Sequence, residues 1–354
     1  MKRLDIAVIP GDGIGKEVVP EALRVLDVIA EIHGGLEFNY SHYPWSCEYY
    51  IKHGEMMPKD GLEQISQSDA IFLGAVGDPT LVPDHVSLAG LLLKIRREFQ
   101  QVINVRPAKM LEGMVSPLSR PENFDIMIVR ENSEGEYSSI GGRVHSGEDE
   151  VVVQNAVFTK KGVSRVMQYG FEIAQTRSGR LTSATKSNGI AHSMPFWDEV
   201  FKELSANYPD VKTNSEHIDA LSAFFITKPQ TLDVVVASNL FGDILSDIGA
   251  AIMGSIGIAP AGNINLNGKF PSMFEPVHGS APDIYGKGIA NPIGQIWTAK
   301  MMLDHLGETE MGALVLQAIE DTLQQGIKTG DIGGSSNTKE VTDAVIEALQ
   351  KRSN

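Results

Sequence analysis

Short apolar runs recur along the chain, and stretches with helical periodicity lie between many of them. The runs are residues 4–9, 70–74, 125–129, 151–153 and 232–236. Amphipathic patterns occupy, for example, 163–176 and 199–206. Neighbouring parallel strands need a long crossover connection, which is usually a helix. The alternation therefore predicts an α/β fold with a largely parallel sheet.

The first run leads into the turn PGDGIG at 10–15, and a helix pattern then continues to Gly34. The turn does not have the spacing of a G-x-G-x-x-G motif, and Glu17 follows Lys16 where a P-loop needs Ser or Thr. We interpret it as a tight turn before a helix. At the other end of the chain, Asn337 and Glu340 have capping-box spacing and predict the start of a final helix. The Gly/Ser-rich stretches 141–142 and 333–336 are expected in loops.

Length and composition bound the classes of protein and partner. A chain of 354 residues exceeds what a single core usually supports, so two domains are expected. The formal net charge of −15, from 30 Lys and Arg against 45 Asp and Glu, disfavours nucleic acid and anionic membranes as partners. The single cysteine, Cys47, excludes an internal disulfide and indicates a reducing compartment, the cytoplasm. We expect a buried, inert thiol, and find no signal peptide and no membrane span.

Two carboxylates stand four residues apart in SNLFGDILSDIGAAI, residues 238–252. If Gly242 opens a helix after the run 234–236, Asp243 and Asp247 lie on one helical face near its start. Such oxygen ligands suit Mg²⁺ or Mn²⁺, with positions left for water or substrate. The alternative is an ordinary helix start, where acids are favoured by the helix dipole.

Basic side chains interrupt or follow several apolar segments. Arg96, Arg106 and Arg130 have this placement, and their guanidinium forks could hold a dicarboxylate. Arg97 would be their solvated neighbour. A surface arginine with a packed stem remains the alternative for each.

Three further residues have side chains that could move protons or bind a metal. Tyr137 lies in a polar loop after Arg130, and Lys186 follows a strand-like run. Asp219 could complete an oxygen-rich metal site. A hydrogen-bonded tyrosine and a surface lysine are the alternatives.

The segment FEPVHGSAPD, residues 274–283, is dense in residues that expose backbone amides. An acid at its end, Asp283, could bind both ribose hydroxyls of a nucleotide and would repel a 2′-phosphate. An ordinary surface loop is the alternative.

Together these segments resemble the β-decarboxylating dehydrogenase family, which includes isocitrate and isopropylmalate dehydrogenases. The resemblance runs from IPGDGIG at residue 9 to GKGIANPIGQIW at 297 and is most specific in SNLFGDILSD and FEPVHGSAPDIYGKGIANP. Within the family, RENSEGEYSSIGG and TSATKSNGIAHSMPFWDEV look most like the tartrate and D-malate dehydrogenase (decarboxylating) branch.

The resemblance implies a two-domain fold with a cleft between the domains, distinct from a G-x-G-x-x-G Rossmann fold. Residues 1–101 and 253–354 would form the cofactor-side domain, and 102–252 the domain with the metal ligands and the interface of a homodimer. It implies oxidative decarboxylation of a 2-hydroxy dicarboxylate, D-malate to pyruvate and CO₂ or tartrate, with NAD and Mg²⁺ or Mn²⁺.

The resemblance also implies roles for individual residues. Arg96, Arg106 and Arg130 would hold substrate, and Asp219, Asp243 and Asp247 the metal. Lys186 would take the proton from the C2 hydroxyl and Tyr137 would protonate the enol, with Lys186 and Asp219 contributed by the partner subunit. The cofactor would be bound by His278, Gly279, Ser280, Ala281, Asp283 and Asn291.

One position departs from the family pattern. Ala89 stands where the tartrate and D-malate branch usually has a bulky aromatic and isopropylmalate enzymes an acid. The alternatives are therefore 3-isopropylmalate, isocitrate or homoisocitrate as substrate. Two other functions remain as alternatives. A regulatory subunit without activity would be expected to lack Lys186, Tyr137 or one of the aspartates, all of which are present. A sugar-phosphate-binding protein would bind its ligand without redox activity.

Overall fold

The computed structural model describes residues 1–119 and 123–353 and divides the chain into two compact units. The first unit comprises Met1–Gln101, Met110–Pro117 and Met253–Asn354, and the second Val102–Lys109 and Leu118–Ile252. Both ends of the chain thus belong to one unit. The chain passes between the units at residues 101 and 252, and residues 110–117 also belong to the first unit.

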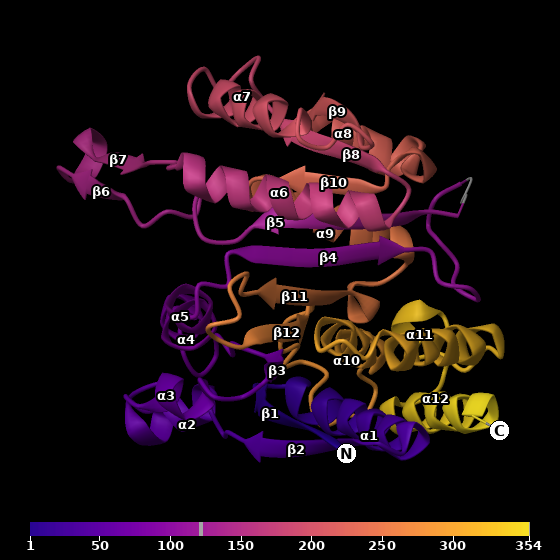
Figure 1. Ribbon diagram of the computed structural model, residues 1–354. Coiled ribbons are helices and arrows are strands. Elements are labelled where there is room, and N and C mark those ends of the chain that lie inside the picture. Colours follow the sequence, from indigo (N-terminus) through magenta and orange to yellow (C-terminus); the bar gives the residue numbers. More distant parts are fainter. Residues whose placement is uncertain (120–122, 354) are drawn as a thin grey trace. The chain divides into compact units, whose positions relative to one another are not determined.

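Of the elements in the described residues, the first unit contains five strands and most of the α-helices (Figure 1). They are β1 (Lys2–Gly11), α1 (Gly15–His33), β2 (Leu36–His42), α2 (Cys47–His53), α3 (Gly61–Ile65), β3 (Ala70–Ala75), α4 (Asp84–Gly90), α5 (Leu92–Glu98), β11 (Pro260–Ile264), β12 (Ser272–Pro276), α10 (Ile293–His305), α11 (Thr309–Gln324) and α12 (Thr338–Ser353).

The strands of the first unit lie in the order β2-β1-β3-β12-β11. All neighbours are parallel except β11 and β12. Helices α1, α10, α11 and α12 pack together beside this sheet (Figure 1). The predicted capping box of α12 is confirmed, since Asn337 and Glu340 exchange side chain to backbone hydrogen bonds of 2.9 Å.

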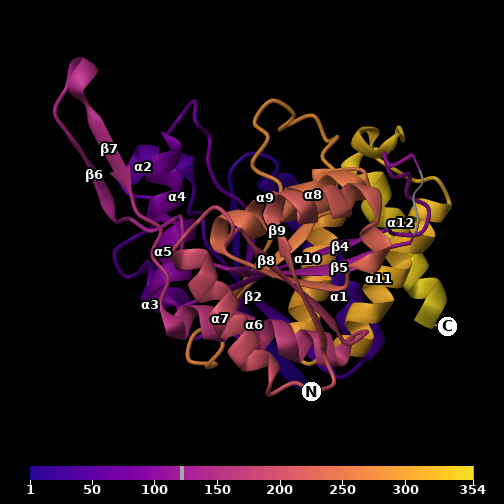
Figure 2. The same cartoon turned by 90° about the horizontal axis from the view of Figure 1, so that it is seen from above.

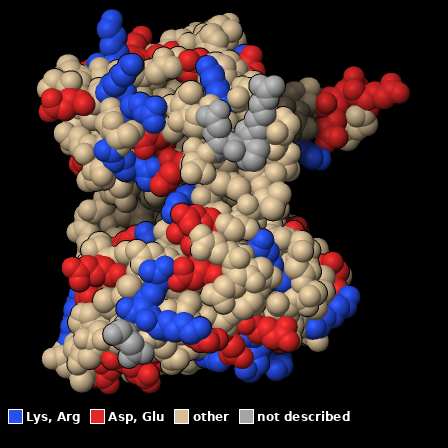
Figure 3. All heavy atoms as spheres, turned by 90° about the vertical axis from the view of Figure 1, so that its right-hand side faces the viewer, with Lys and Arg blue, Asp and Glu red and all other residues tan. Residues whose placement is uncertain are grey.

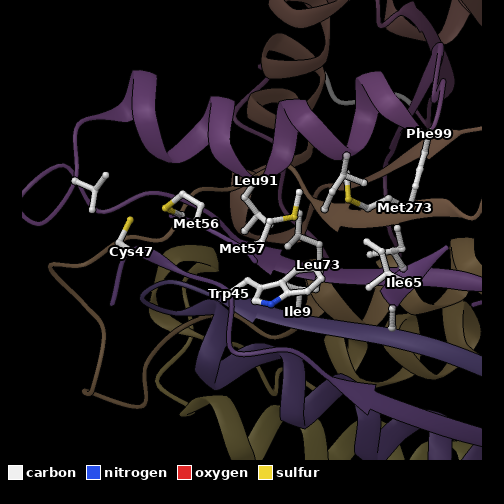
Figure 4. Close-up of a cluster of buried hydrophobic side chains, with 14 residues drawn as sticks. Ile9, Trp45, Cys47, Met56, Met57, Ile65, Leu73, Leu91, Phe99 and Met273 are labelled. Carbon is white, nitrogen blue, oxygen red and sulfur yellow. The ribbon is translucent and has the colours of Figure 1, made fainter. Parts of the chain in front are cut away.

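Side chains from α2 to α5 and from the strands form a buried cluster in the first unit (Figure 4). Trp45, Met57 and Leu91 lie with Ile9 and Leu73, which alternate with residues facing the other side of their strands. Each fully buried side chain of this size contributes about 2 kcal/mol to stability. This core fixes the short helix α5, which carries Arg96.

The second unit has the strand order β4-β5-β10-β8-β9 and its own helices. Its elements are β4 (Ile103–Lys109), β5 (Asp125–Glu131), β6 (Gly141–Val144), β7 (Val151–Gln154), α6 (Lys160–Thr176), β8 (Arg180–Thr185), α7 (Ser193–Ser205), β9 (Lys212–His217), α8 (Ile218–Thr227), β10 (Val234–Ala237) and α9 (Asn239–Met253). Only β4 and β5 are antiparallel among these five neighbouring strands. The predicted α/β class and largely parallel pairing are confirmed.

For residues 141–153 one expectation is wrong, and the other, a strand over 151–153, holds without the expected place in the parallel sheet. The glycine pair 141–142 belongs to strand β6, and the run 151–153 forms an exposed hairpin strand, β7. Gly141 is needed because a Cβ there would lie 2.2 Å from the Val153 carbonyl oxygen. The hairpin extends away from α6 and α7 of the same unit (Figure 2). An apolar run therefore marked a strand here, but not a buried one.

Charged side chains of both signs are interspersed on the face shown in Figure 3. Among the described residues, no helix is both long and apolar enough to cross a membrane.

Candidate active site

Two predicted arginines lie on the same face of the sheet in the second unit. Asn104 of β4 pairs with Arg130 of β5, and Arg106 lies two residues further along β4. Residues two apart on a strand point to the same face. Arg106 Nε donates to Asn104 Oδ1 at 2.7 Å. Both arginines are buried, which contradicts the surface alternative for these two.

Helix α9 packs on this face and begins earlier than expected. It starts at Asn239, so the prediction that Gly242 opens it is wrong. Gly242 instead permits close packing, because a Cβ there would lie 2.6 Å from Cβ of Arg130. Asn239 Oδ1 accepts hydrogen bonds from Arg130 Nε at 3.0 Å and Nη2 at 2.7 Å.

Asp243 is the centre of the cluster. Its Oδ1 accepts from Arg106 Nη1 at 3.2 Å and also from Arg130 Nη1, and its Oδ2 accepts from the Tyr137 hydroxyl at 2.9 Å. Arg106 Nη1 also donates to Ser246 Oγ at 2.7 Å. The sequence-predicted residues Arg106, Arg130, Tyr137 and Asp243 are thus brought together.

Tyr137 has a raised pKa in this setting. Partial burial is the largest cause, followed by the hydrogen bond to Asp243 and its negative charge, while Arg130 and Arg106 act in the opposite direction. The Arg130 guanidinium carbon also lies 5.7 Å from the centre of the Tyr137 ring. The phenol therefore remains protonated at neutral pH.

Asp247 lies one helical turn beyond Asp243 and is exposed. Its pKa is raised by partial burial and then by the charge of Asp243, while Arg106 and Arg130 lower it. Two neighbouring carboxylates that repel each other form a donor set that fits a hard divalent cation. Among the described residues, however, no three His, Cys, Asp or Glu side chains form a metal-binding group, so Asp219 does not join this pair within the chain.

Lys186 and Asp219 form a separate pair. Lys186 directly follows β8, and Asp219 lies in the first turn of α8. Lys186 Nζ is 2.6 Å from Asp219 Oδ1, and this hydrogen bond is the largest cause of the lowered pKa of Asp219. Asp219 is exposed, so the pair is open to a neighbouring molecule.

Arg96 is positioned in the first unit by an acid of β12. Its Nη2 donates to Glu275 Oε1, which also accepts from Asn263 Nδ2 at 2.8 Å. Within the described structure, the buried Arg96 Nε has no hydrogen-bond partner. Arg97 is exposed, as predicted. Burial of Arg96 and Glu275 together fixes the guanidinium orientation.

The segment predicted to bind the cofactor is folded onto the turn after β1. Ile14 N donates to the Ser280 carbonyl at 2.8 Å, and the Ser280 hydroxyl donates to the Gly77 carbonyl. His278 is buried, which lowers its pKa, and its Nδ1 is 2.9 Å from the Gly279 carbonyl oxygen. In the described structure His278 Nε2 has no hydrogen-bond partner. Asp283 is exposed at the end of the segment.

A second layer behind this segment includes a residue that sequence reasoning missed. Asp331 accepts hydrogen bonds from Asn291 Nδ2 at 3.1 Å and Ser255 Oγ at 2.6 Å. Asn291 in turn accepts from the Ile293 backbone N–H at 3.0 Å. The sequence carries no local signal for Asp331, because it lies 40 residues after Asn291.

Sequence reasoning also missed three glutamates in the loop that holds Tyr137. Glu131, which is buried, accepts from the backbone N–H of Glu134 at 2.7 Å. Glu134 accepts from Thr159 N at 2.8 Å, and Glu136 from Ser238 Oγ at 3.0 Å. Their density in the loop was a possible signal for side chains that bind backbone amides.

The expectation for Cys47 is confirmed. The thiol is buried, and its Sγ accepts from Asp78 N at 3.3 Å. Burial, followed by the charge of Asp12, raises its pKa to about 12. A thiol with this pKa is a poor nucleophile at neutral pH.

Comparison with known proteins places this geometry in one family. The family model described as isocitrate/isopropylmalate dehydrogenase matches residues 5–345. The chain is 62% identical to a probable tartrate dehydrogenase/decarboxylase from Bacillus subtilis over 351 residues, covering 99% of both chains. It is 54% identical to the D-malate dehydrogenase (decarboxylating) of Escherichia coli over 359 residues, again covering 99% of both. Among solved structures, an isocitrate dehydrogenase from Methylococcus capsulatus matches with a TM-score of 0.88 and 31% identity, covering 98% of this chain and 99% of that one.

Proposed function

The chain belongs to the isocitrate/isopropylmalate dehydrogenase family, and we propose that it oxidatively decarboxylates D-malate or tartrate. The enzyme acts on a CH–OH group of a hydroxy dicarboxylate, as its relatives' names state for them. For D-malate the balance is D-malate plus NAD⁺ giving pyruvate, CO₂ and NADH. The observation that carries the proposal is Asp243, bonded by Arg106, Arg130 and Tyr137 with Asp247 one turn away.

Asp243 and Asp247 would hold the divalent cation, Mg²⁺ or Mn²⁺, together with Asp219 of the partner subunit. When bound, the cation would supply Lewis acidity toward the substrate, and a nicotinamide would supply the hydride acceptor. The arginines that now bind Asp243 would turn to the substrate carboxylates, for which their forks are suited. Arg96, oriented by Glu275, would supply a third guanidinium.

Two residues would move the protons. Lys186 would take the proton of the C2 hydroxyl in its neutral amine form, after Asp219, which now binds its ammonium, turns to the metal. Tyr137 would donate its proton to C3 after CO₂ leaves, and its raised pKa keeps that proton in place until then.

NAD is the proposed nicotinamide cofactor. The support is Asp283, an exposed acid that would accept hydrogen bonds from ribose hydroxyls and repel the 2′-phosphate of NADP. His278 to Ala281 and Asn291 would contact the adenosine half. The comparison of initial rates with NAD⁺ and NADP⁺ tests this assignment.

A homodimer with shared active sites is also proposed. Lys186 and Asp219 pair with each other and not with the Asp243 cluster, so the chain offers them outward. The β6–β7 hairpin exposes Val144 and Val151 to Val153, and an isolated hairpin is marginally stable without a partner surface. A second copy of the chain would satisfy both features.

Subunit mixing tests the shared site. Homodimers of Lys186→Ala and of Tyr137→Phe should each be nearly inactive. After dissociation and reassociation, half of the dimers would be mixed and each would hold one intact site, restoring about a quarter of wild-type activity. No recovery, with exchange verified by tagged subunits, would show that both residues serve the site of their own chain.

The substrate itself is tested by a panel. NADH formation with Mn²⁺ should be fastest with D-malate or tartrate, and slower with 3-isopropylmalate, isocitrate and homoisocitrate. Ala89, exposed on α4, leaves room for a larger C3 substituent, which keeps 3-isopropylmalate as the second candidate. The proposed location is the cytoplasm, on the ground that the single cysteine is a buried free thiol.

A further inference from the structure

Glu136 connects the loop that carries Tyr137 to the start of α9. Ser238 Oγ donates to Glu136 Oε1 at 3.0 Å, and the backbone N–H of Leu240 donates to Oε2 at 3.2 Å. Ser238 and Leu240 flank Asn239, where α9 begins. The carboxylate therefore lies at the positive end of the helix dipole, where a negative charge is stabilised.

The residue next to Glu136 is Tyr137, which packing alone does not fix. Tyr137 is 57% exposed, yet its hydroxyl donates to Asp243 Oδ2 at 2.9 Å. Asp243 lies one turn into the helix whose start Glu136 binds. Glu136 and Tyr137 therefore attach adjacent positions of the loop to adjacent turns of α9.

Other contacts hold the loop mainly to residues 154–159. Glu134 accepts from Thr159 N at 2.8 Å and from Thr159 Oγ1 at 2.6 Å, and Ser138 Oγ donates to the Asn155 carbonyl. Asn239 Nδ2 donates to the Glu134 carbonyl at 3.3 Å, and Gln154 Nε2 donates to the Glu136 carbonyl at 3.4 Å. Gly135 exchanges backbone hydrogen bonds with Val157. Glu136 differs from these contacts because its carboxylate joins the loop to the start of α9 through two hydrogen bonds, which are stronger than bonds between neutral groups.

We propose that Glu136 is a positioning residue that sets the distance from the Tyr137 hydroxyl to the reacting centre by tying its loop to α9. The proposal rests on the proposed function, in which Tyr137 is the acid. Both carboxylate oxygens of Glu136 bind protein groups, so we assign it no direct role toward substrate or metal. It acts by removing the freedom of an exposed side chain whose displacement by about 1 Å would slow proton transfer.

The first test compares Glu136→Ala and Glu136→Gln with D-malate, NAD⁺ and Mn²⁺. Glu136→Ala should lower kcat by about 10- to 100-fold with less than a threefold change in KM for D-malate. Glu136→Gln should recover part of kcat, because its amide oxygen can accept one of the two hydrogen bonds. The matched control is Glu199→Ala, an exposed acid on α7, which should stay within about twofold of wild type.

The second test is a double-mutant cycle with Tyr137→Phe. If Glu136 acts through the tyrosine, Glu136→Ala should cost less than about threefold in the Tyr137→Phe background. An equal loss of kcat in both backgrounds would show that Glu136 acts through α9 or the fold, and would overturn the proposal. No loss in the wild-type background would overturn it as well.

Failure of the proposed function is recognised separately. If the wild type forms no NADH with any substrate of the panel, the function is rejected, and the loop is then judged by amide hydrogen exchange. Glu136→Gln should speed exchange of residues 136–140 and of the first turn of α9 together, without lowering Mn²⁺ affinity more than about twofold. Unchanged exchange in both segments would contradict the tie itself.

Discussion

The Asp243 cluster of the second unit and the 278–291 segment of the first are built on different principles. Around Asp243 the side chains bind one another through charged hydrogen bonds, which a cation and an anionic substrate would have to replace. The segment 278–291 is instead fixed by hydrogen bonds that involve the backbone, and two of its own residues, Ser280 and Asn291, are buried. If the proposed roles are right, catalysis would depend on rearranging charges in the second unit, whereas the cofactor would bind to a preformed surface of the first.

The largest effect should come from removing a proton carrier in the second unit. Lys186→Ala should lower kcat by about 10²- to 10⁴-fold, since the proton of the C2 hydroxyl loses its acceptor. The Kd for NAD⁺, measured by fluorescence titration, should change less than about twofold. A comparable weakening of NAD⁺ binding would break the division of roles between the units.

The next effect concerns the centre of the charged cluster. Asp243→Asn should weaken Mn²⁺ binding by at least about tenfold, measured by electron paramagnetic resonance titration. The variant also frees Arg106 and Arg130 from a carboxylate, so affinity for a dicarboxylate in the presence of EDTA should rise. Wild-type Mn²⁺ affinity in Asp243→Asn would contradict the metal role.

A smaller effect is expected behind the cofactor segment. Asn291→Ala removes the acceptor of the Ile293 N–H and one donor to Asp331, and should raise KM for NAD⁺ by about tenfold, or 1.4 kcal/mol. Asp331→Ala should have the same direction. Steady-state kinetics and Mn²⁺ titration of both variants should show an unchanged kcat and an unchanged Mn²⁺ affinity. A loss of Mn²⁺ affinity would contradict the proposed division of roles between the two units.

The smallest effect is one of stability. The raised pKa of Asp247 means that its negative charge opposes folding when no metal is bound. Protonated Asp247 carries no such penalty, so the chain is more stable below the ordinary aspartate pKa, and this advantage is lost as pH rises through the raised pKa. Asp247→Asn should therefore raise the Tm in EDTA at neutral pH, and the difference should vanish at acid pH. With Mn²⁺ the order should reverse, because the variant binds it less. A lower Tm in EDTA would indicate a stabilising role for Asp247.

Periodicity was sufficient for the strands whose two faces are buried, and capping chemistry for the last helix. It did not distinguish the hairpin 141–154, because the exposed strand β7 has the same apolar pattern as a buried strand. Gly242 was misread because its closeness to Arg130 is a tertiary contact that no local pattern records. The nested division of the chain came from the family resemblance alone.

The candidate site was also only partly predictable from the sequence. Residue chemistry suggested Asp243, Arg106 and Arg130, but not that Asp243 would bind both arginines and Tyr137 at once. Asp331 and Glu136 were missed because they act through partners distant in sequence. Those partners become visible only when the strand register and the start of α9 are known.

The central proposal is that a hydroxy dicarboxylate is oxidised and decarboxylated at the Asp243 cluster. The most direct measurement is the parallel assay of NADH and CO₂ formed from D-malate or tartrate, with Mn²⁺ and with EDTA. We predict equal amounts of both products from D-malate, abolished by EDTA and restored by Mn²⁺. No NADH from any hydroxy dicarboxylate with metal and NAD⁺ present would contradict the account.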